Sequence, residues 1–170
     1  KYLPFHYEYI EQFRLFHYSA DYFIEHCSYP SGIIEYLGSF LIQFFNQPHV
    51  GAGIVTILLL SVGIGIQQIF KRIASHVDMP LAYLLPTLFL LFAGMDINYH
   101  LEGTLAFALS VWFLNIQVSF VRPVHRMISG VLLSWTLYYL AGPAFALFAL
   151  CSVIYEWHKR ELSMLYSALL

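Results

Sequence analysis

The chain has few charged residues, and over long stretches it lacks basic ones. Only 11% of its 170 residues are charged and its mean hydropathy is +0.67, whereas about 25% of the residues in a soluble domain are charged. Between Arg14 and Lys71 there is no lysine or arginine. This composition argues against a water-exposed fold and predicts a protein that lies in the lipid bilayer.

The low net charge and the small number of cysteines limit the partners and covalent links that can be expected. The net charge is -2 and there is no basic tract, so we expect no nucleic-acid partner. Two cysteines, Cys27 and Cys151, are too few for a disulfide framework. We expect no cofactor and no metal.

The start and end of the chain indicate a fragment. It opens with KYLPFHYEY, without Met or the parts of a signal peptide, and it stops within ELSMLYSALL. We expect a membrane segment before Lys1 and further chain after Leu170. The expected partners are therefore the lipid bilayer and helices missing from this fragment.

Residues 1–50 are predicted to form two amphipathic helices. Between Phe5 and His26, and again between Gly32 and Asn46, apolar residues recur at helical spacing and carboxylates lie off that face. Pro48 is expected to end the second helix. Because both polar faces carry carboxylates rather than basic residues, the two helices are predicted to lie in the membrane plane on the outer surface.

The predicted fold class is an all-α membrane protein, with these two in-plane helices followed by about five transmembrane helices. The expected spans are residues 51–70, 79–95, 104–121, 127–140 and 144–157. The first span has no charge, and the second contains Pro86, which is expected to kink it.

The last two spans are predicted to form a hairpin. Residues 127–157 would extend about 46 Å as one helix, which is too long for one crossing and short for two, and Gly142-Pro143 interrupts them. Basic residues at both ends favour an even number of crossings. Each short helix would reach about 21 Å, so three outcomes are open: the bilayer thins, Arg126 and Lys159 snorkel, or the pair stops short of the far surface.

Charge also predicts the orientation. Basic residues concentrate in loops that stay in the cytoplasm, so Lys71, Arg122 and the start of residues 159–170 are expected there. Residues 1–50 are then extracytoplasmic, together with most of the acidic residues.

Two groups of polar residues outside the spans are candidates for chemistry. In the link after the second span, Asp96, Asn98, His100 and Glu102 alternate, so an extended chain would point them to one side. Such a set could hold a metal or contact a substrate, and the candidate substrate-binding residues are Asn98, Tyr99, His100 and Glu102. The favoured alternative is an ordinary polar turn, in which Glu102 complements a helix dipole.

Carboxylates of the first amphipathic helix form the second group, because a carboxylate can act as a general base at a membrane surface. The candidate catalytic residues are Glu11 and Asp21 from this helix, together with Asp96 from the link after the second span. The favoured alternative is a solvated helix face, with Glu11 paired to Arg14 and Asp21 acting as a helix cap.

Polar residues inside the spans are expected to join helices. Asn115, Gln117 and Ser119 form the only dense polar group, and Ser61 with Gly65 has the small-xxx-small spacing of a helix contact. No ionisable group is expected at mid-membrane, which disfavours a transporter.

The segments YEYIEQFRLFHYSADYF, GIIEYLGSFLIQFF and NYHLEGTLAF resemble an uncharacterised multi-spanning inner-membrane protein family of Bacteroides-type bacteria. The resemblance covers nearly the whole chain and implies a multi-pass protein of the inner membrane, without an assigned activity. It draws attention to Glu11, Gln12, Asp21, Tyr22, Gln43 and residues 98–103.

Three functions remain open at this point. The leading one is a membrane module of unknown activity within a larger protein. The second is a membrane enzyme that acts on a lipid-linked substrate at the outer face, similar in architecture to polytopic glycosyltransferases. Such enzymes hold a donor phosphate with an outer basic residue, and the outer segments lack one after Arg14. The third is a transporter.

Overall fold

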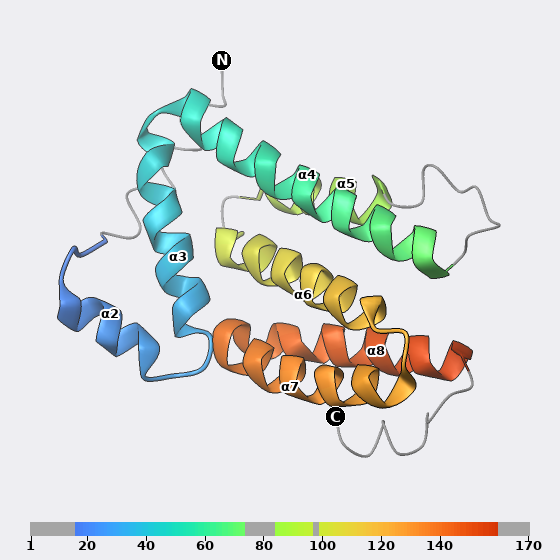
Figure 1. Ribbon diagram of the computed structural model, residues 1–170. Coiled ribbons are helices and arrows are strands. Elements are labelled where there is room, and N and C mark those ends of the chain that lie inside the picture. Colours follow the sequence, from blue (N-terminus) through green and yellow to red (C-terminus); the bar gives the residue numbers. More distant parts are fainter. Residues whose placement is uncertain (1–15, 74–83, 97–98, 160–170) are drawn as a thin grey trace.

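The computed structural model describes residues 16–73, 84–96 and 99–159, and this part of the chain is helical without β-strands (Figure 1). Two short 3-10 helices, η1 (Gln43–Asn46) and η2 (Gly142–Ala144), connect neighbouring α-helices. The α-helices are α2 (Ala20–Cys27), α3 (Gly32–Ile42), α4 (Pro48–Ile73), α5 (Leu84–Ala93), α6 (Leu101–Ser119), α7 (Pro123–Ala141) and α8 (Phe145–Lys159).

Helices α4 to α8 run back and forth between the two ends of a bundle, and α3 crosses one of these ends (Figure 1). Helix α6 is central, because it packs against α4, α7, α8 and α3, while α5 packs on α4. The chain reverses at η2, so that α7 and α8 lie side by side. Helix α2 packs on α3, outside the bundle.

Polar side chains and one glycine hold α6 in the centre. Asn115 donates from Nδ2 to the carbonyl oxygen of Gly65 at 2.8 Å, and Ser152 donates to Oε1 of Gln117 at 2.5 Å. A Cβ on Gly65 would lie 2.6 Å from Val111 Cγ1, so α4 and α6 approach closely at this point. The predicted roles of Asn115, Gln117 and Gly65 in joining helices are confirmed.

Apolar residues fill the interior and also cover much of the outside. The outward side chains of Ile57, Phe89, Trp135 and Trp157 are between 68% and 72% exposed. Within the part of the chain that the structure describes, three stretches are long and apolar enough to cross a membrane: Pro48–Ile73, Leu101–Ser119 and Pro123–Lys159. The third contains the reversal at η2.

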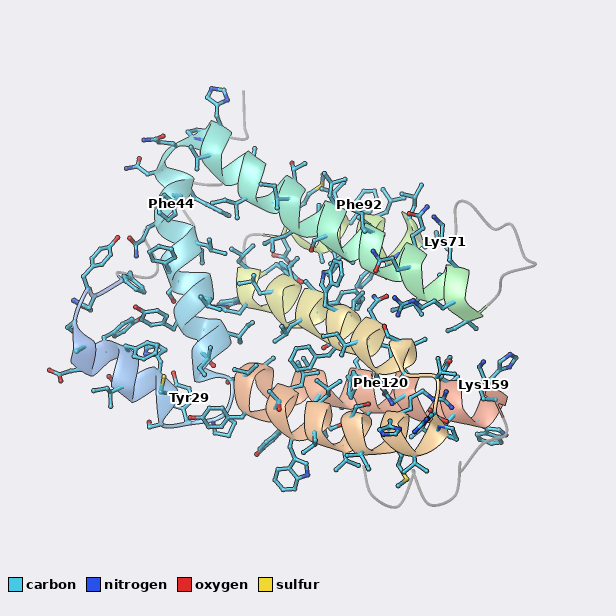
Figure 2. The ribbon with its side chains drawn as sticks, in the orientation of Figure 1. Tyr29, Phe44, Lys71, Phe92, Phe120 and Lys159 are labelled. Carbon is cyan, nitrogen blue, oxygen red and sulfur yellow. The ribbon has the colours of Figure 1, made fainter. Side chains whose placement is uncertain are left out.

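Charge is separated between the two ends of the bundle. Basic residues lie where α4 and α8 end and where α7 begins, and Figure 2 shows Lys71 and Lys159 at this end. The opposite end, where α3 crosses, carries the carboxylates of Glu35 and Glu102. Among the described residues, Glu156 is the acidic residue that lies at the basic end.

Several helix boundaries differ from those predicted. Helix α2 begins at Ala20, because the side chain of Ser19 accepts a hydrogen bond from the backbone N–H of Tyr22 and residues 16–19 are not helical. The predicted helix over residues 5–15 lies outside the described residues. Pro48 does not end a helix: it begins α4, where its missing N–H is no loss.

The predicted spans and the described helices overlap without sharing all their ends. The described part of α5 covers ten residues, Leu84–Ala93, and residues 79–83 of the predicted span lie outside the described residues. Predicted spans 51–70 and 127–140 lie within the longer helices α4 and α7. The helix predicted over 104–121 begins earlier, at Leu101, and ends at Ser119, and in the span predicted over 144–157 α8 begins at Phe145, after η2.

Candidate functional site

A cavity of about 600 Å³ opens where α3 crosses α6 and the tip of the α7–α8 hairpin. Its volume lies within the range of about 300–1,000 Å³ that is common for small-molecule sites. Its lining residues are Ser31, Ile34, Glu35, His100, Glu102, Gly103, Ala106, Phe107, Ser110, Ala141, Pro143, Ala144 and Leu147.

The turn before α3 fixes this helix against the hairpin tip. Ser31 has φ 72°, a left-handed conformation, and its backbone N–H donates to the carbonyl oxygen of Tyr139 at 3.1 Å. A Cβ on Gly32 would lie 1.8 Å from the carbonyl oxygen of His26, so only glycine fits there. Gly142, with φ 56°, packs against Ser31 from the other side. One wall of the cavity is therefore set by backbone contacts.

Glu35 is held by two donors from the same turn. Ser31 Oγ donates to its Oε1 at 2.8 Å, and the Tyr29 hydroxyl donates to its Oε2 at 3.1 Å. Burial, followed by the hydrogen bond to Glu35, raises the pKa of the Tyr29 phenol. The phenol therefore stays protonated and remains a donor at neutral pH.

The first turn of α6 supplies the facing polar residues. His100 precedes the helix and is exposed, whereas Glu102 is only 9% exposed and packs against Gly38 of α3. A Cβ on Gly38 would lie 2.6 Å from Glu102 Cγ. The glycine therefore lets α3 approach the first turn of α6, which carries Glu102. The sequence prediction that Glu102 lies in the first helical turn is confirmed.

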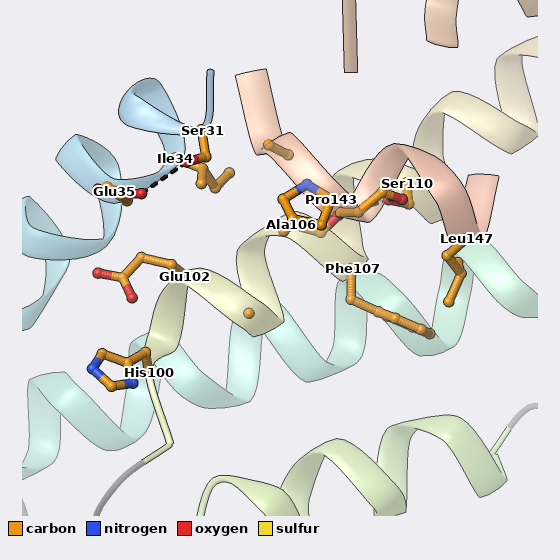
Figure 3. A pocket seen from close by; sticks show the side chains of 13 residues that line it. Ser31, Ile34, Glu35, His100, Glu102, Ala106, Phe107, Ser110, Pro143 and Leu147 are labelled. Carbon is orange, nitrogen blue, oxygen red and sulfur yellow. Dashed lines mark hydrogen bonds between the residues drawn. The ribbon is translucent and has the colours of Figure 1, made fainter. Parts of the chain in front are cut away.

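The polarity of the lining changes along the cavity. Figure 3 shows Glu35, Glu102 and His100 at one end, and Phe107 and Leu147 at the other. Ser110 also lies at the second end, but its hydroxyl donates to the carbonyl oxygens of its own helix and of the hairpin tip, at 2.9 and 3.3 Å. The cavity is thus polar under α3 and apolar between α6 and α8.

Of the predicted site residues that the structure describes, two line this cavity together, His100 and Glu102. An extended chain that points Asp96, Asn98, His100 and Glu102 to one side was the alternative not favoured, and it does not reach Glu102, because α6 begins at Leu101 and Glu102 is already helical. Tyr99 lies beside the cavity, where its hydroxyl accepts a hydrogen bond from Thr104 Oγ1 at 3.2 Å.

The candidate catalytic residues do not converge. Asp21 is exposed in the first turn of α2, and Ser19 provides the cap that Asp21 was considered for. Asp96 is exposed in the turn after α5 and is not among the cavity-lining residues. Glu11 and Asn98 lie outside the described residues. Within the described ranges, no group of three or more His, Cys, Asp or Glu side chains is placed to hold a metal ion.

A second polar feature, which the sequence did not reveal, lies at the basic end. Arg126 and Glu156 form a two-pronged ion pair, with Nε to Oε1 at 2.5 Å and Nη2 to Oε2 at 3.0 Å. Both side chains are 3% exposed. Snorkelling was one of the alternatives for Arg126, but its guanidinium is buried in the bundle, 5.4 Å from the centre of the Tyr155 ring.

Fold and cavity together define an all-helical protein whose long helices are apolar enough to cross a membrane. A family model described as a family of unknown function (DUF6057) matches residues 1–170. The chain belongs to this family. No curated protein matches the chain, and no solved structure matches it. The expected resemblance to an uncharacterised family is confirmed, while the bacterial source and the membrane location stay predictions.

Proposed function

We propose that the protein is a multi-pass protein of the bacterial inner membrane and acts as a membrane-embedded module with a ligand cavity at its outer end. The observation that carries this proposal is the separation of charge between the two ends of the bundle. Lys and Arg resist translocation, so the end with Lys71, Arg122 and Lys159 faces the cytoplasm. Residues 1–50 and the cavity then lie on the outer side.

The dimensions of the helices support this arrangement. At 1.5 Å per residue α4 extends about 39 Å, and α6 and α7 about 28 Å each, close to the ~30 Å thickness of the hydrocarbon core. Helix α3 runs across their outer ends (Figure 1), as an in-plane helix would. The exposed apolar faces of α4, α5, α7 and α8 then contact lipid or helices from outside this chain.

Extraction from membranes tests the proposal. We expect the protein to stay with the membrane pellet after washing at alkaline pH with carbonate, and to enter solution only with detergent. Release by carbonate alone contradicts a multi-pass protein. A soluble protein expressed in the same cells provides the control for complete washing.

The cavity also favours a second function, a membrane enzyme that acts on a lipid-linked substrate at the outer face. The polar end of the cavity carries the carboxylates of Glu35 and Glu102 and the imidazole of His100, and these groups are the usual general acids and bases. Among the described residues, no Lys or Arg lines the cavity. A donor phosphate would therefore meet carboxylates there, which places this function second.

A further inference from the structure

We propose that the cavity binds a single-chain amphiphile with an amine head group, the amine lying between Glu35 and Glu102 and the chain lying between α6 and α8. This inference rests on the proposed membrane orientation, which puts the polar end of the cavity at the outer interface. Its basis is the gradient of polarity along one cavity, rather than the acidic residues alone.

The shape of the cavity fits an elongated ligand. Glu102 and Ser110, which line opposite ends, are eight residues apart on α6, which corresponds to about 12 Å along the helix. Glu35, Glu102 and His100 lie at one end, beside Ile34, and Phe107 and Leu147 lie at the other, with Ser110 (Figure 3). A wholly polar ligand would leave the apolar end unfilled, and a wholly apolar one would place hydrocarbon against the polar carboxyl groups of Glu35 and Glu102.

The apolar end receives the chain. Phe107 and Leu147 line it, and Leu147 is 41% exposed, so this end opens toward the outside of the bundle. In the proposed orientation that outside is lipid, from which a hydrocarbon chain can enter without crossing water. The one hydroxyl there, on Ser110, is already bonded to two carbonyl oxygens, so the chain displaces no hydrogen bond.

The polar end selects the head group. Glu35 is fixed by Ser31 and Tyr29, which together use two of the roughly four acceptor sites of a carboxylate and leave sites for a ligand donor. An ammonium group gives three donors and a positive charge, and hydrogen bonds between ionised partners are about twice as strong as neutral ones. A carboxylate or phosphate head group would be repelled, because no described Lys or Arg lines the cavity.

Photo-labelling with two matched probes tests the inference. The probes are dodecylamine and dodecanoic acid, each with a diazirine at the far end of its chain, added to the full chain in nanodiscs of phosphatidylcholine. Labelled peptides are identified by mass spectrometry. We expect the amine probe to label the segments around Phe107 and Leu147 about tenfold more than the acid probe, and unlabelled dodecylamine to compete.

Variants then separate the two ends of the site. Glu35→Gln is expected to reduce labelling by the amine about tenfold and to leave labelling by the acid unchanged or raised. Leu147→Trp narrows the apolar end and is expected to reduce labelling by the amine, whereas Leu150→Trp, on the same helix but outside the lining, is the matched control.

Three results overturn the inference. The first is equal labelling by both probes, and the second is labelling spread evenly over the lipid-facing helices. The third is that both Glu35→Gln and Glu102→Gln keep the preference for the amine probe. The comparison of probes needs no variant, so a misfolded variant does not prevent the decision. If carbonate extracts the protein, the proposed function fails. If the protein stays in the membrane and the probes do not differ, only the amphiphile site fails.

Discussion

At the scale of single residues, the site depends on glycines that let segments approach more closely than a side chain permits. Gly32 lies against the backbone of His26, Gly38 against Glu102, and Gly142 against Ser31. Each contact joins α3 or the turn before it to another segment. The polar end of the cavity is therefore built by close backbone approaches, on which the positions of Glu35 and Glu102 depend.

The sharpest prediction at this scale concerns Gly32→Ala. The added methyl would meet the carbonyl oxygen of His26 at 1.8 Å, and since this is backbone, the turn itself must move. We expect a loss of about 1–3 kcal/mol in the free energy of unfolding, the usual cost of overpacking. Thermal unfolding in a mild detergent measures it.

Gly53→Ala is the matched control, because a Cβ there meets no atom within 4 Å and the position is inside α4. Alanine is favoured over glycine in a helix by about 1 kcal/mol, so we expect no loss. Equal stability of both variants would show that the turn before α3 is not as tightly packed as described.

At the scale of helices, α7 and α8 are joined at both ends. The reversal at η2 connects them at the end that α3 crosses, and the pair Arg126–Glu156 connects them at the basic end. Arg126 also donates to the carbonyl oxygens of Phe120 and Val121 at 3.4 and 3.5 Å, so it reaches the end of α6. The pair fixes the hairpin against the central helix.

Breaking this pair is expected to be costly, because the remaining charge stays buried. Removing one partner of a buried ion pair costs about 3–5 kcal/mol, whereas replacing both with apolar residues is often nearly neutral. We therefore expect Arg126→Met and Glu156→Leu each to destabilise the protein strongly, and the double variant to recover most of the loss. Unfolding in detergent at several temperatures gives the three values.

Additive losses in the double variant would contradict the pairing. His158→Ala serves as a control on the same end of α8, since His158 is exposed and is expected to tolerate the change.

The sequence predicted the helices better than the contacts between them. Apolar runs located α4, α6 and the α7–α8 hairpin, and spacing identified Asn115, Gln117 and Gly65 as contact residues. The pair Arg126–Glu156 joins residues 30 apart in the chain and depends on the register of the hairpin. The spacing of apolar residues in the sequence does not determine which residues of α7 and α8 lie opposite each other.

The site was predicted only in part for the same reason. His100 and Glu102 are only two positions apart in the sequence, so a polar link could be noticed. Glu35 was expected to lie on the polar face of the second amphipathic helix. Its neighbour across the cavity comes from a distant helix, and the crossing of α3 over α6 brings the two together. Asp21 was predicted from its charge alone, and α2 places it outside the cavity.

At the scale of the whole molecule, the account rests on one orientation. Acidic residues and the cavity lie at the end crossed by α3, and basic residues lie at the other. If the bundle crosses the bilayer, the rule that basic residues stay in the cytoplasm fixes which end is outside. The proposed entry of a hydrocarbon chain from the lipid depends on that orientation.

Labelling of single cysteines tests this most directly. In a chain with Cys27→Ala and Cys151→Ala, one new cysteine is placed at the outer end by Ala20→Cys and, separately, at the basic end by His158→Cys, both at exposed positions. A membrane-impermeant maleimide is added to intact spheroplasts and to lysed ones. We expect Ala20→Cys to react in intact spheroplasts and His158→Cys to react only after lysis; the reverse pattern would invert the orientation, and the same response at both positions would show that the bundle does not cross the membrane between them.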